Sequence, residues 1–446
     1  MAVDTPASYR NLVLYEVYTR NHGPHGTFAD VEADLERIRA LGVDVVWLMP
    51  IHPIGHLHRK GSLGSPYSII DYRGINPEYG TMADFTRLIE RAHALGLRVM
   101  IDVVYNHTAH DSLLVREHPE WFHQDAHGRP ISTVPEWSDV IDLRHPNPDL
   151  TDYLCETLQG WAAQGVDGFR CDVASLLPQE FWLEARRRVA QVRPGVLWLA
   201  ESVHAAFVAF RRARGLPTLA DSELYAAFDL TYDYDIWPLW QAAVRGQVPV
   251  GRYLEILRFQ DCIYPENYVK MRCVENHDQA RIQRLAPSRN QALAWTAFQA
   301  FNRGAFLIYA GQESAAVHTP SLFDIDRIEW GHYELAPFLT TLAGLKKDPA
   351  LRQGQFVLLA AEPAIQAAWV HPTAGLYGLF NVAAAGGQAP VQLPDGVYEE
   401  VLGGSEVRVR HGRMALPPAA AIVRCAGAGP FRPLRFDLLD YAFPAQ

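Results

Sequence analysis

Short apolar runs alternate with amphipathic segments over most of this 446-residue chain. In the amphipathic segments, apolar residues recur three and four positions apart, which predicts helices within 28–41, 82–95, 179–192 and 291–301. The apolar runs are hydrophobic on both faces, as strands covered by helices should be. We predict eight such strands, within 12–18, 43–49, 99–104, 168–172, 197–201, 226–230, 268–275 and 305–309.

Eight strands that are each followed by helix-compatible sequence indicate the α/β class and a parallel (β/α)8 TIM barrel. We expect this barrel to comprise residues 1–104 and 149–348. Residues 105–148 are rich in His, Pro, Trp and Asp and lack a long helical pattern, so we expect an inserted domain after the third strand. That position places the insertion over the end of the barrel where active sites lie.

The pattern changes again at residue 349, where short alternating segments are separated by turn residues such as Gly386-Gly387 and Asp395-Gly396. These segments predict an antiparallel β-sandwich over 349–427. The remaining tail, 428–446, is Pro-rich and has no clear element.

Composition narrows the classes of partner and the compartment. The formal net charge of -10 argues against nucleic acid, because binding to that polyanion depends on Lys and Arg. No apolar run is long enough for a membrane span, and the polar N-terminus lacks a signal-peptide pattern, so we predict a cytoplasmic protein that binds no membrane. The five cysteines are scattered without CxxC spacing, which is typical of reduced thiols and not of a zinc site. The sequence makes no prediction of oligomeric state.

Polar clusters follow four of the predicted strands, within 102–107, 168–172, 199–201 and 274–278. Because the carboxyl ends of barrel strands converge on one cavity, we expect Asp172, Glu201 and Asp278 to face one another. Arg170 lies two residues before Asp172, so both side chains leave the strand on the same face and can form an ion pair. Such a pair alone would be structural, but its coincidence with Glu201 and Asp278 favours catalysis.

Three facing carboxylates suit the cleavage of a glycosidic bond. One can attack the anomeric carbon, and a second, once protonated, can release the leaving group and then activate water. Close like charges raise the pKa of one carboxyl group and keep it protonated. The third can bind sugar hydroxyls and favour the oxocarbenium-like charge.

These clusters resemble, in order and separation, the four short signature regions of the alpha-amylase family of glycoside hydrolases. Ser65-Pro-Tyr67 and the stretch 309–313 strengthen the resemblance, which extends over about 12–425. It implies that Asp172 is the nucleophile, Glu201 the general acid/base and Asp278 the transition-state stabiliser. It also implies substrate-binding roles for Tyr67, His107, Arg170 and His277, with Asp102 supporting the site.

The resemblance implies no cofactor for the chemistry, but it does imply a structural calcium ion at the base of the inserted domain. Asn106 and Asp142 match the family's side-chain ligands for that ion. The alternative is that Asn106 bonds only the loop backbone. Many endo-acting members carry a Lys-His pair after the nucleophile strand, where this chain has Ser175-Leu176, and this difference weakens both the endo-amylase and the calcium predictions.

We therefore predict a retaining glycosidase that cleaves α-1,4-glucosidic bonds of maltooligosaccharides or related α-glucans through a covalent glycosyl-aspartate. The first alternative is a transglycosylase or isomerase of α-glucosides, with trehalose- or sucrose-type chemistry, which would use the same intermediate. The second is a non-catalytic barrel that serves as a binding subunit. The presence of all three carboxylates argues against this last hypothesis.

Overall fold

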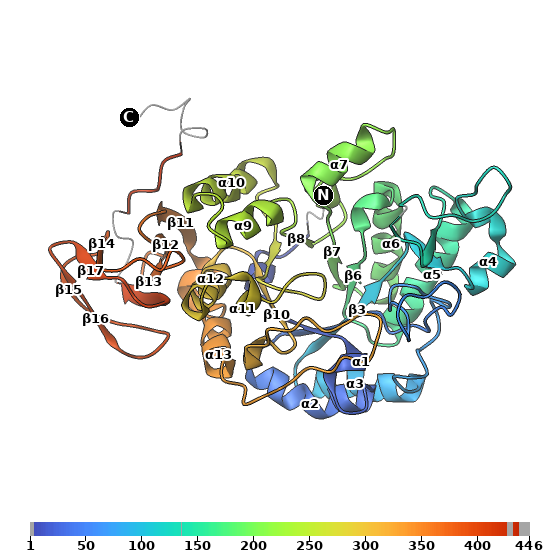
Figure 1. Ribbon diagram of the computed structural model, residues 1–446, viewed down its shortest axis with the longest axis horizontal. Helices are drawn as coiled ribbons and strands as arrows, with labels where there is room; N and C mark the ends of the chain where they lie inside the picture. Colours follow the sequence, from blue (N-terminus) through green and yellow to red (C-terminus); the bar gives the residue numbers. More distant parts are fainter. Residues whose placement is uncertain (1–3, 135, 426–430, 437–446) are drawn as a thin grey trace.

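A computed structural model describes residues 4–134, 136–425 and 431–436 of the chain (Figure 1). Its centre is a closed barrel with the strand order β1-β10-β9-β8-β7-β6-β3-β2, in which every neighbouring pair is parallel. The strands are β1 (Val13–Val17), β2 (Val45–Leu48), β3 (Arg98–Val103), β6 (Gly168–Cys171), β7 (Leu197–Ala200), β8 (Leu230–Tyr232), β9 (Lys270–Arg272) and β10 (Ala305–Tyr309). The predicted eight-stranded TIM barrel is thus confirmed.

Helices surround the barrel. Two of them begin at a capping threonine and are followed by a glycine. The longer ones are α2 (Phe28–Ala40), α3 (Met82–Ala94), α5 (Pro148–Ala163), α6 (Gln179–Val192), α10 (Val250–Ile263), α12 (Arg289–Phe301) and α13 (Ala336–Leu345). Thr27 and Thr81 cap α2 and α3 through reciprocal bonds with the aspartate three residues later. Gly42 and Gly96 then follow these two helices in the left-handed conformation that favours glycine.

Shorter helices fill the connections: α1 (Thr19–His22), α4 (Leu113–Glu117), α7 (Ala205–Arg212), α8 (Asp221–Leu224), α9 (Trp237–Val244), α11 (Ile282–Leu285) and α14 (Pro349–Gln353). No helix in the described ranges is both long and apolar enough to cross a lipid bilayer.

The strand predicted at 226–230 is wrong, because this stretch begins as helical turns. The amides of Ala227 and Phe228 both bond the carbonyl of Leu224, and β8 starts only at Leu230. The apolar residues 224, 227 and 228 therefore recur at helical spacing and are buried on one face. A short apolar run of this kind does not distinguish a strand from a turn of helix.

The insertion after β3 contains an antiparallel pair, β4 (His107–Ala109) and β5 (Val140–Asp142). The C-terminal region has two antiparallel four-stranded sheets, in agreement with the predicted sandwich. One sheet contains β11 (Gln355–Ala360), β12 (Ile365–Val370), β13 (Gly375–Phe380) and β18 (Ala420–Cys425). The other contains β14 (Gln388–Pro390), β17 (Arg413–Ala415), β16 (Glu406–Arg410) and β15 (Gly396–Glu399). Of the tail predicted at 428–446, only 431–436 lies within the described residues, and there the Leu434 amide bonds Leu358 of β11.

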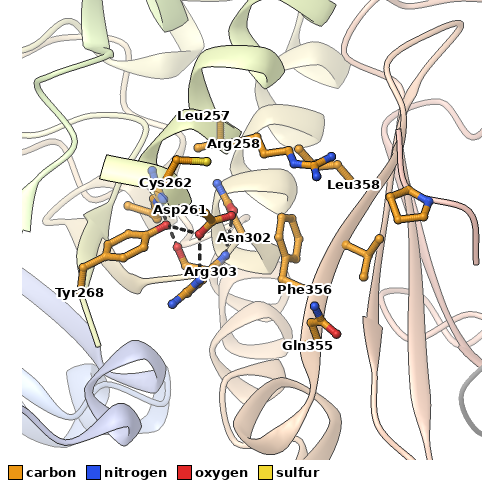
Figure 2. Close-up of a pocket in the computed structure, with 13 residues that line it drawn as sticks. Leu257, Arg258, Asp261, Cys262, Tyr268, Asn302, Arg303, Gln355, Phe356 and Leu358 are labelled. Carbon is orange, nitrogen blue, oxygen red and sulfur yellow. Dashed lines mark hydrogen bonds and ion pairs between the residues drawn. The ribbon is translucent and has the colours of Figure 1, made fainter. Parts of the chain in front are cut away.

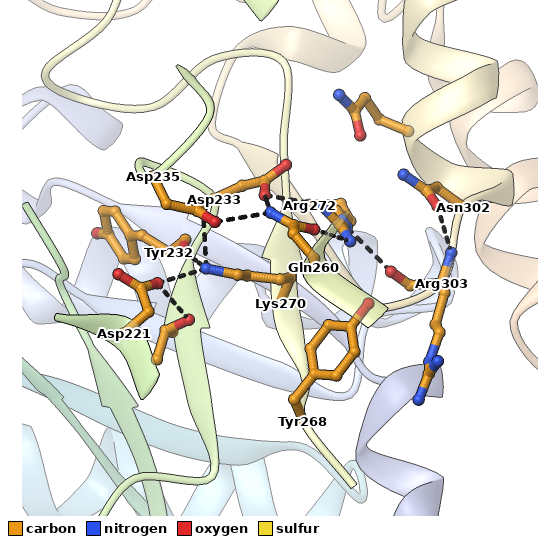
Figure 3. Close-up of polar contacts among 12 residues, drawn as sticks. Asp221, Tyr232, Asp233, Asp235, Gln260, Tyr268, Lys270, Arg272, Asn302 and Arg303 are labelled. Carbon is orange, nitrogen blue, oxygen red and sulfur yellow. Dashed lines mark hydrogen bonds and ion pairs between the residues drawn. The ribbon is translucent and has the colours of Figure 1, made fainter. Parts of the chain in front are cut away.

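The layer between the barrel wall and α10 is polar behind β8 and β9 (Figure 3). Lys270 forms ion pairs with Asp221 and, at 3.0 Å, with Asp235, while Arg272 lies 2.7 Å from Asp233. Gln260 of α10 donates to Asp233 at 2.9 Å and accepts from Arg272 at the same distance. Buried charges need such partners, so these contacts hold the two shortest barrel strands against α8 and α10.

Candidate active site

The carboxyl ends of the barrel strands bring the predicted acidic residues together. Asp172 directly follows β6, Glu201 directly follows β7, and Asp278 lies on the segment after β9. A pocket of about 250 Å³ opens between them. Its lining includes six of the predicted side chains: Tyr67, His107, Asp172, Glu201, His277 and Asp278.

A second pocket, of about 270 Å³, lies between α10 and β11 (Figure 2). Tyr268 precedes β9 and Arg303 precedes β10, so this pocket lies at the amino ends of the strands, away from Asp172. Among its described lining residues Asp261 is the only carboxylate, and it pairs with Arg303 at 2.7 Å. The pocket therefore lacks the facing carboxylates that glycosidic cleavage requires.

Arg170 is fully buried beneath the catalytic pocket and contacts several of its acids. One terminal nitrogen, Nη1, donates to Asp102 Oδ1 at 2.7 Å and to Asp172 Oδ1 at 2.9 Å. The other, Nη2, lies 2.9 Å from Glu201 Oε2. The planar guanidinium therefore fixes three carboxylates relative to one another.

Asp172 and Glu201 lie in environments that give their carboxyl groups different pKa values. Burial, together with the nearby carboxylates of Asp172 and Asp278, raises the pKa of Glu201 to about 7 against the opposing charge of Arg170. Burial also raises the pKa of Asp172, to about 6, again against Arg170. Glu201 is thus the more readily protonated of the two, which suits a general acid beside an ionised nucleophile.

The backbone directly after Asp172 adopts a strained conformation at the point where it contacts Glu201. Val173 has φ of 35°, a left-handed conformation that is costly for a β-branched residue. In this conformation its amide donates to Glu201 Oε2 at 2.7 Å. The strain is thus associated with a hydrogen bond that orients the candidate acid.

His277 connects the third carboxylate with Tyr67. Its Nε2 lies 3.2 Å from Asp278 Oδ2 and 2.7 Å from the Tyr67 hydroxyl, and the two rings stack at 5.4 Å between centroids. Burial alone would raise the pKa of Asp278, but His277 beside it lowers that pKa overall. Tyr67 in turn donates to Asp102 at 3.1 Å. Asp102 is therefore a buried support for Tyr67 and Arg170 and does not line the pocket.

His107 lies on the side of the pocket formed by the insertion. Its Nε2 is 3.9 Å from Asp172 Oδ2, and its ring packs 5.4 Å from the ring of Trp137. Burial lowers the pKa of His107, so the neutral imidazole is favoured and can donate one hydrogen bond to a sugar hydroxyl.

The polar residues of the site that were missed from the sequence include Glu16, Lys60 and Asp139. Glu16 of β1 is fully buried and contacts His277 Nδ1. The available signal was an acid inside the apolar strand Val13–Val17. Lys60, from the loop after β2, lies 2.7 Å from Asp139 of the insertion. Among the described residues that line the pocket, Lys60 is the only lysine or arginine, and the sequence carried no periodic signal for it.

The two residues predicted as calcium ligands lie close together but have protein partners. Asp142 accepts from the Thr133 amide at 2.8 Å and from the hydroxyls of Ser132 and Thr133, so both of its oxygens have donors. The amide of Asn106 lies 3.3 Å from His107 Nδ1. Calcium needs six to eight oxygens, and a carboxylate occupied by three donors does not suit that ion. Calcium stays a prediction from resemblance, and no step below depends on it.

Comparison with known proteins adds to this geometry. The family model described as "Alpha amylase, catalytic domain" matches residues 12–129 and 135–354, and "Bacterial Alpha amylase C-terminal domain" matches 358–423. A crystal structure of an alpha-amylase from Lactobacillus plantarum is 43% identical with a TM-score of 0.91, covering 94% of this chain and 100% of that one. A maltogenic alpha-amylase, AmyB from Thermotoga neapolitana, is 32% identical with a TM-score of 0.84, covering 94% and 99%.

The chain also resembles transferases. An alpha-1,4-glucan:maltose-1-phosphate maltosyltransferase from Rhodospirillum rubrum is 34% identical over 290 residues, which are 59% of this chain. The match spans only 38% of that transferase, so it concerns a part of the larger protein.

Proposed function

Because the chain belongs to the alpha-amylase family, we propose that it is a retaining glycoside hydrolase that cleaves α-1,4-glucosidic bonds of maltooligosaccharides or related α-glucans. The observation that carries this proposal is that one buried guanidinium contacts both acids: Arg170 Nη1 donates a hydrogen bond to Asp172, and Nη2 forms an ion pair with Glu201 at 2.9 Å. Contact with adjacent nitrogens favours the short carboxyl separation, about 5 Å, that retaining enzymes use.

In the proposed first step, the Asp172 carboxylate attacks the anomeric carbon while Glu201 gives its proton to the departing glycosidic oxygen. The product is a glycosyl ester of Asp172, and the leaving sugar takes up the proton. In the second step Glu201, now ionised, removes a proton from water, whose oxygen displaces Asp172 and restores both groups. Asp278 and His277 would bind sugar hydroxyls as positive charge develops on the ring.

The charges of the pocket favour a neutral substrate over a phosphorylated one. The ammonium of Lys60 is paired with Asp139 at 2.7 Å, and Asp172, Glu201 and Asp278 add negative charge to the same lining. A phosphate dianion would be repelled by these carboxylates and would have to compete with Asp139 for the ammonium. This argument favours hydrolysis of neutral glucans over transfer from a sugar 1-phosphate.

Transfer to a sugar hydroxyl is the second candidate, because the glycosyl-aspartate can react with either acceptor and the Rhodospirillum rubrum relative is a maltosyltransferase. Product identification after incubation with maltotriose, maltose, sucrose and maltose 1-phosphate separates the two. We expect shorter maltooligosaccharides from maltotriose and no phosphate release. New linkages at early times would favour the transferase, and phosphate release would overturn the neutral-substrate argument.

The residue roles need a matched test. Asp172→Asn and Glu201→Gln should each lower kcat by several orders of magnitude, on the order of 10⁴-fold, with the circular dichroism spectrum unchanged. Asp261→Asn, which alters the carboxylate of the second pocket, should leave kcat unchanged. Near-normal activity of either catalytic-site variant would refute the assignment.

A further inference from the structure

Glu16 is an acid inside an otherwise apolar barrel strand. The side chains of all five residues in β1 are buried, and Glu16 has no exposed surface. Its Oε1 contacts His277 Nδ1, whereas its Oε2 has no hydrogen-bond partner in the described part of the chain. Burying a carboxylate this deeply is costly, so its one polar contact needs an explanation beyond packing.

The direction of the surrounding hydrogen bonds determines how many protons His277 carries. The Tyr67 hydroxyl donates to the Asp102 carboxylate, which can only accept while it is ionised. The Tyr67 oxygen must then accept from His277 Nε2, and Asp278 Oδ2 is a second acceptor 3.2 Å from the same nitrogen. At the other side of the ring, the Glu16 carboxylate accepts from Nδ1. Both ring nitrogens therefore carry a proton.

We propose that Glu16 is a positioning residue that holds His277 as an imidazolium, so that its Nε2–H is oriented toward Tyr67, Asp278 and the sugar in the pocket. The sugar contact rests on the proposed function, whereas the charge of the ring does not. The groups that face the ring are Glu16 from β1, Asp278 beside it in the chain and Tyr67 from the loop after β2. Trp47 of β2 contacts it edge-on at 5.9 Å and carries no charge.

The charge of His277 therefore depends on Glu16, which is not among the described residues that line the pocket. The imidazolium compensates Asp278 on one side and Glu16 on the other. Without the Glu16 charge, the ring would lose one of its two carboxylate partners, and the neutral form would become accessible. A neutral ring protonated at Nδ1 would turn a lone pair toward Asp278 and the Tyr67 oxygen, which weakens the bonds that position both groups.

The test is the charge of His277 measured directly in the whole protein. Histidine is labelled with ¹⁵N, the ring signals are assigned with a His277→Gln variant, and the spectra are followed from pH 5 to about 9. We expect the wild-type ring to stay doubly protonated throughout this range. In Glu16→Gln, which keeps the shape and removes the charge, we expect deprotonation to occur within it. Glu16→Asp keeps a charge and should restore the protonated ring.

Activity provides the second readout and a matched control. With maltotriose, Glu16→Gln should raise KM by about tenfold, because the ring that contacts the sugar is no longer held as an imidazolium. Glu313→Gln removes another fully buried acid, whose partners are Arg37 at 2.7 Å, the Tyr15 hydroxyl and the Gly311 amide, so it reports the effect of losing a buried charge alone. That variant should change stability without moving the His277 titration.

Two results would overturn the proposal. One is a wild-type His277 that is neutral at pH 7, and this measurement needs no variant that might misfold. The other is an unchanged His277 titration in Glu16→Gln. If the wild type fails to cleave any glucan while His277 titrates as expected, the proposed function fails and the role of Glu16 in the charge of the ring stands.

Discussion

At the scale of single residues, the site is organised by one guanidinium. Arg170 has no exposed surface and contacts Asp102, Asp172 and Glu201, so its charge opposes the effect of burial on all three carboxylates. Lysine has one compact charged nitrogen and cannot reproduce this planar arrangement. The residue is therefore not interchangeable with another cation.

We expect Arg170→Lys to lower kcat by about 10²- to 10³-fold, a loss typical of removing one oriented electrostatic contact in an active site. We expect the change in kcat to exceed the change in KM, because the guanidinium contacts Asp172 and Glu201 but is not among the described residues that line the pocket. Steady-state kinetics with maltotriose measures the split. An equal fall for a variant of an exposed arginine such as Arg129 would show that the effect is not specific.

The pH dependence of activity follows from the same burial. Asp172 must be ionised to attack, so activity should fall as the pH drops below about 6. Glu201 must be protonated to release the leaving group, so activity should fall as the pH rises above about 7. The pH profile of kcat/KM should therefore be a narrow bell between these values. In Glu201→Gln the alkaline limb of the residual activity should disappear.

The sequence predicted which charged side chains would meet where they follow strands of the barrel. Asp172, Glu201 and Asp278 were expected to face one another because the ends of barrel strands converge, and all three line one pocket, while their catalytic roles stay predictions. Glu16 was missed because it lies within a strand, where a single polar residue does not change the pattern. Lys60 was missed because it comes from a long loop whose path no periodicity predicts.

At the scale of elements, the loop after β2 and the insertion after β3 are joined beside the pocket. Lys60 pairs with Asp139, and Asp111 accepts from the backbone amides of His56 and Leu57. The same loop is attached on its other side, where Ser62 bonds Asp324 at 2.8 Å. These links attach the loop after β2 both to the insertion and to the segment after β10 that contains Asp324.

We expect Asp139→Asn to release the Lys60 ammonium and create affinity for phosphate in the pocket. Inhibition by maltose 1-phosphate should tighten by about tenfold relative to inhibition by maltose, which lacks the charge. Asp111→Asn loosens the same two segments without freeing a cation. In this control, the ratio of the inhibition constants of maltose 1-phosphate and maltose should stay at its wild-type value. The same ratio in both variants would contradict the role given to Asp139.

Elements were predictable where their signals were long. The helices within 28–41 and 82–95 had full amphipathic turns and glycine ends, and they were found close to their observed bounds. β14 and β17 have three residues each and were not predicted, because so short a strand has no measurable alternation. β8 was predicted too early because the apolar run before it forms helical turns, which a short run does not distinguish from a strand.

At the scale of the whole molecule, stability should depend on buried groups that prefer the neutral form. Lys346 is fully buried between the turn 302–304 and α13, where it donates to the carbonyls of Asn302 and Gly304. Burial, together with the charges of Arg272 and Lys347, lowers its pKa to about 7. The unfolded chain therefore holds this proton more tightly than the folded protein does.

Because of Lys346, the free energy of unfolding of the wild type should increase as the pH rises above about 7. Between about pH 7 and the ordinary lysine pKa, the unfolded state binds the extra proton, so deprotonation favours folding. We expect the Tm of the wild type, relative to Lys346→Met, to rise from pH 7 to about 10. Calorimetry at several pH values measures this difference. A constant difference would show that Lys346 is charged in the folded state.

The contact between the Val173 amide and Glu201 has a mechanical consequence. The donor belongs to the residue next to Asp172, so one peptide unit and one hydrogen bond separate Asp172 from Glu201. A displacement of the end of β6 would therefore move both carboxylates together. In the proposed reaction, the spacing on which retention depends would follow from the backbone turn at Val173.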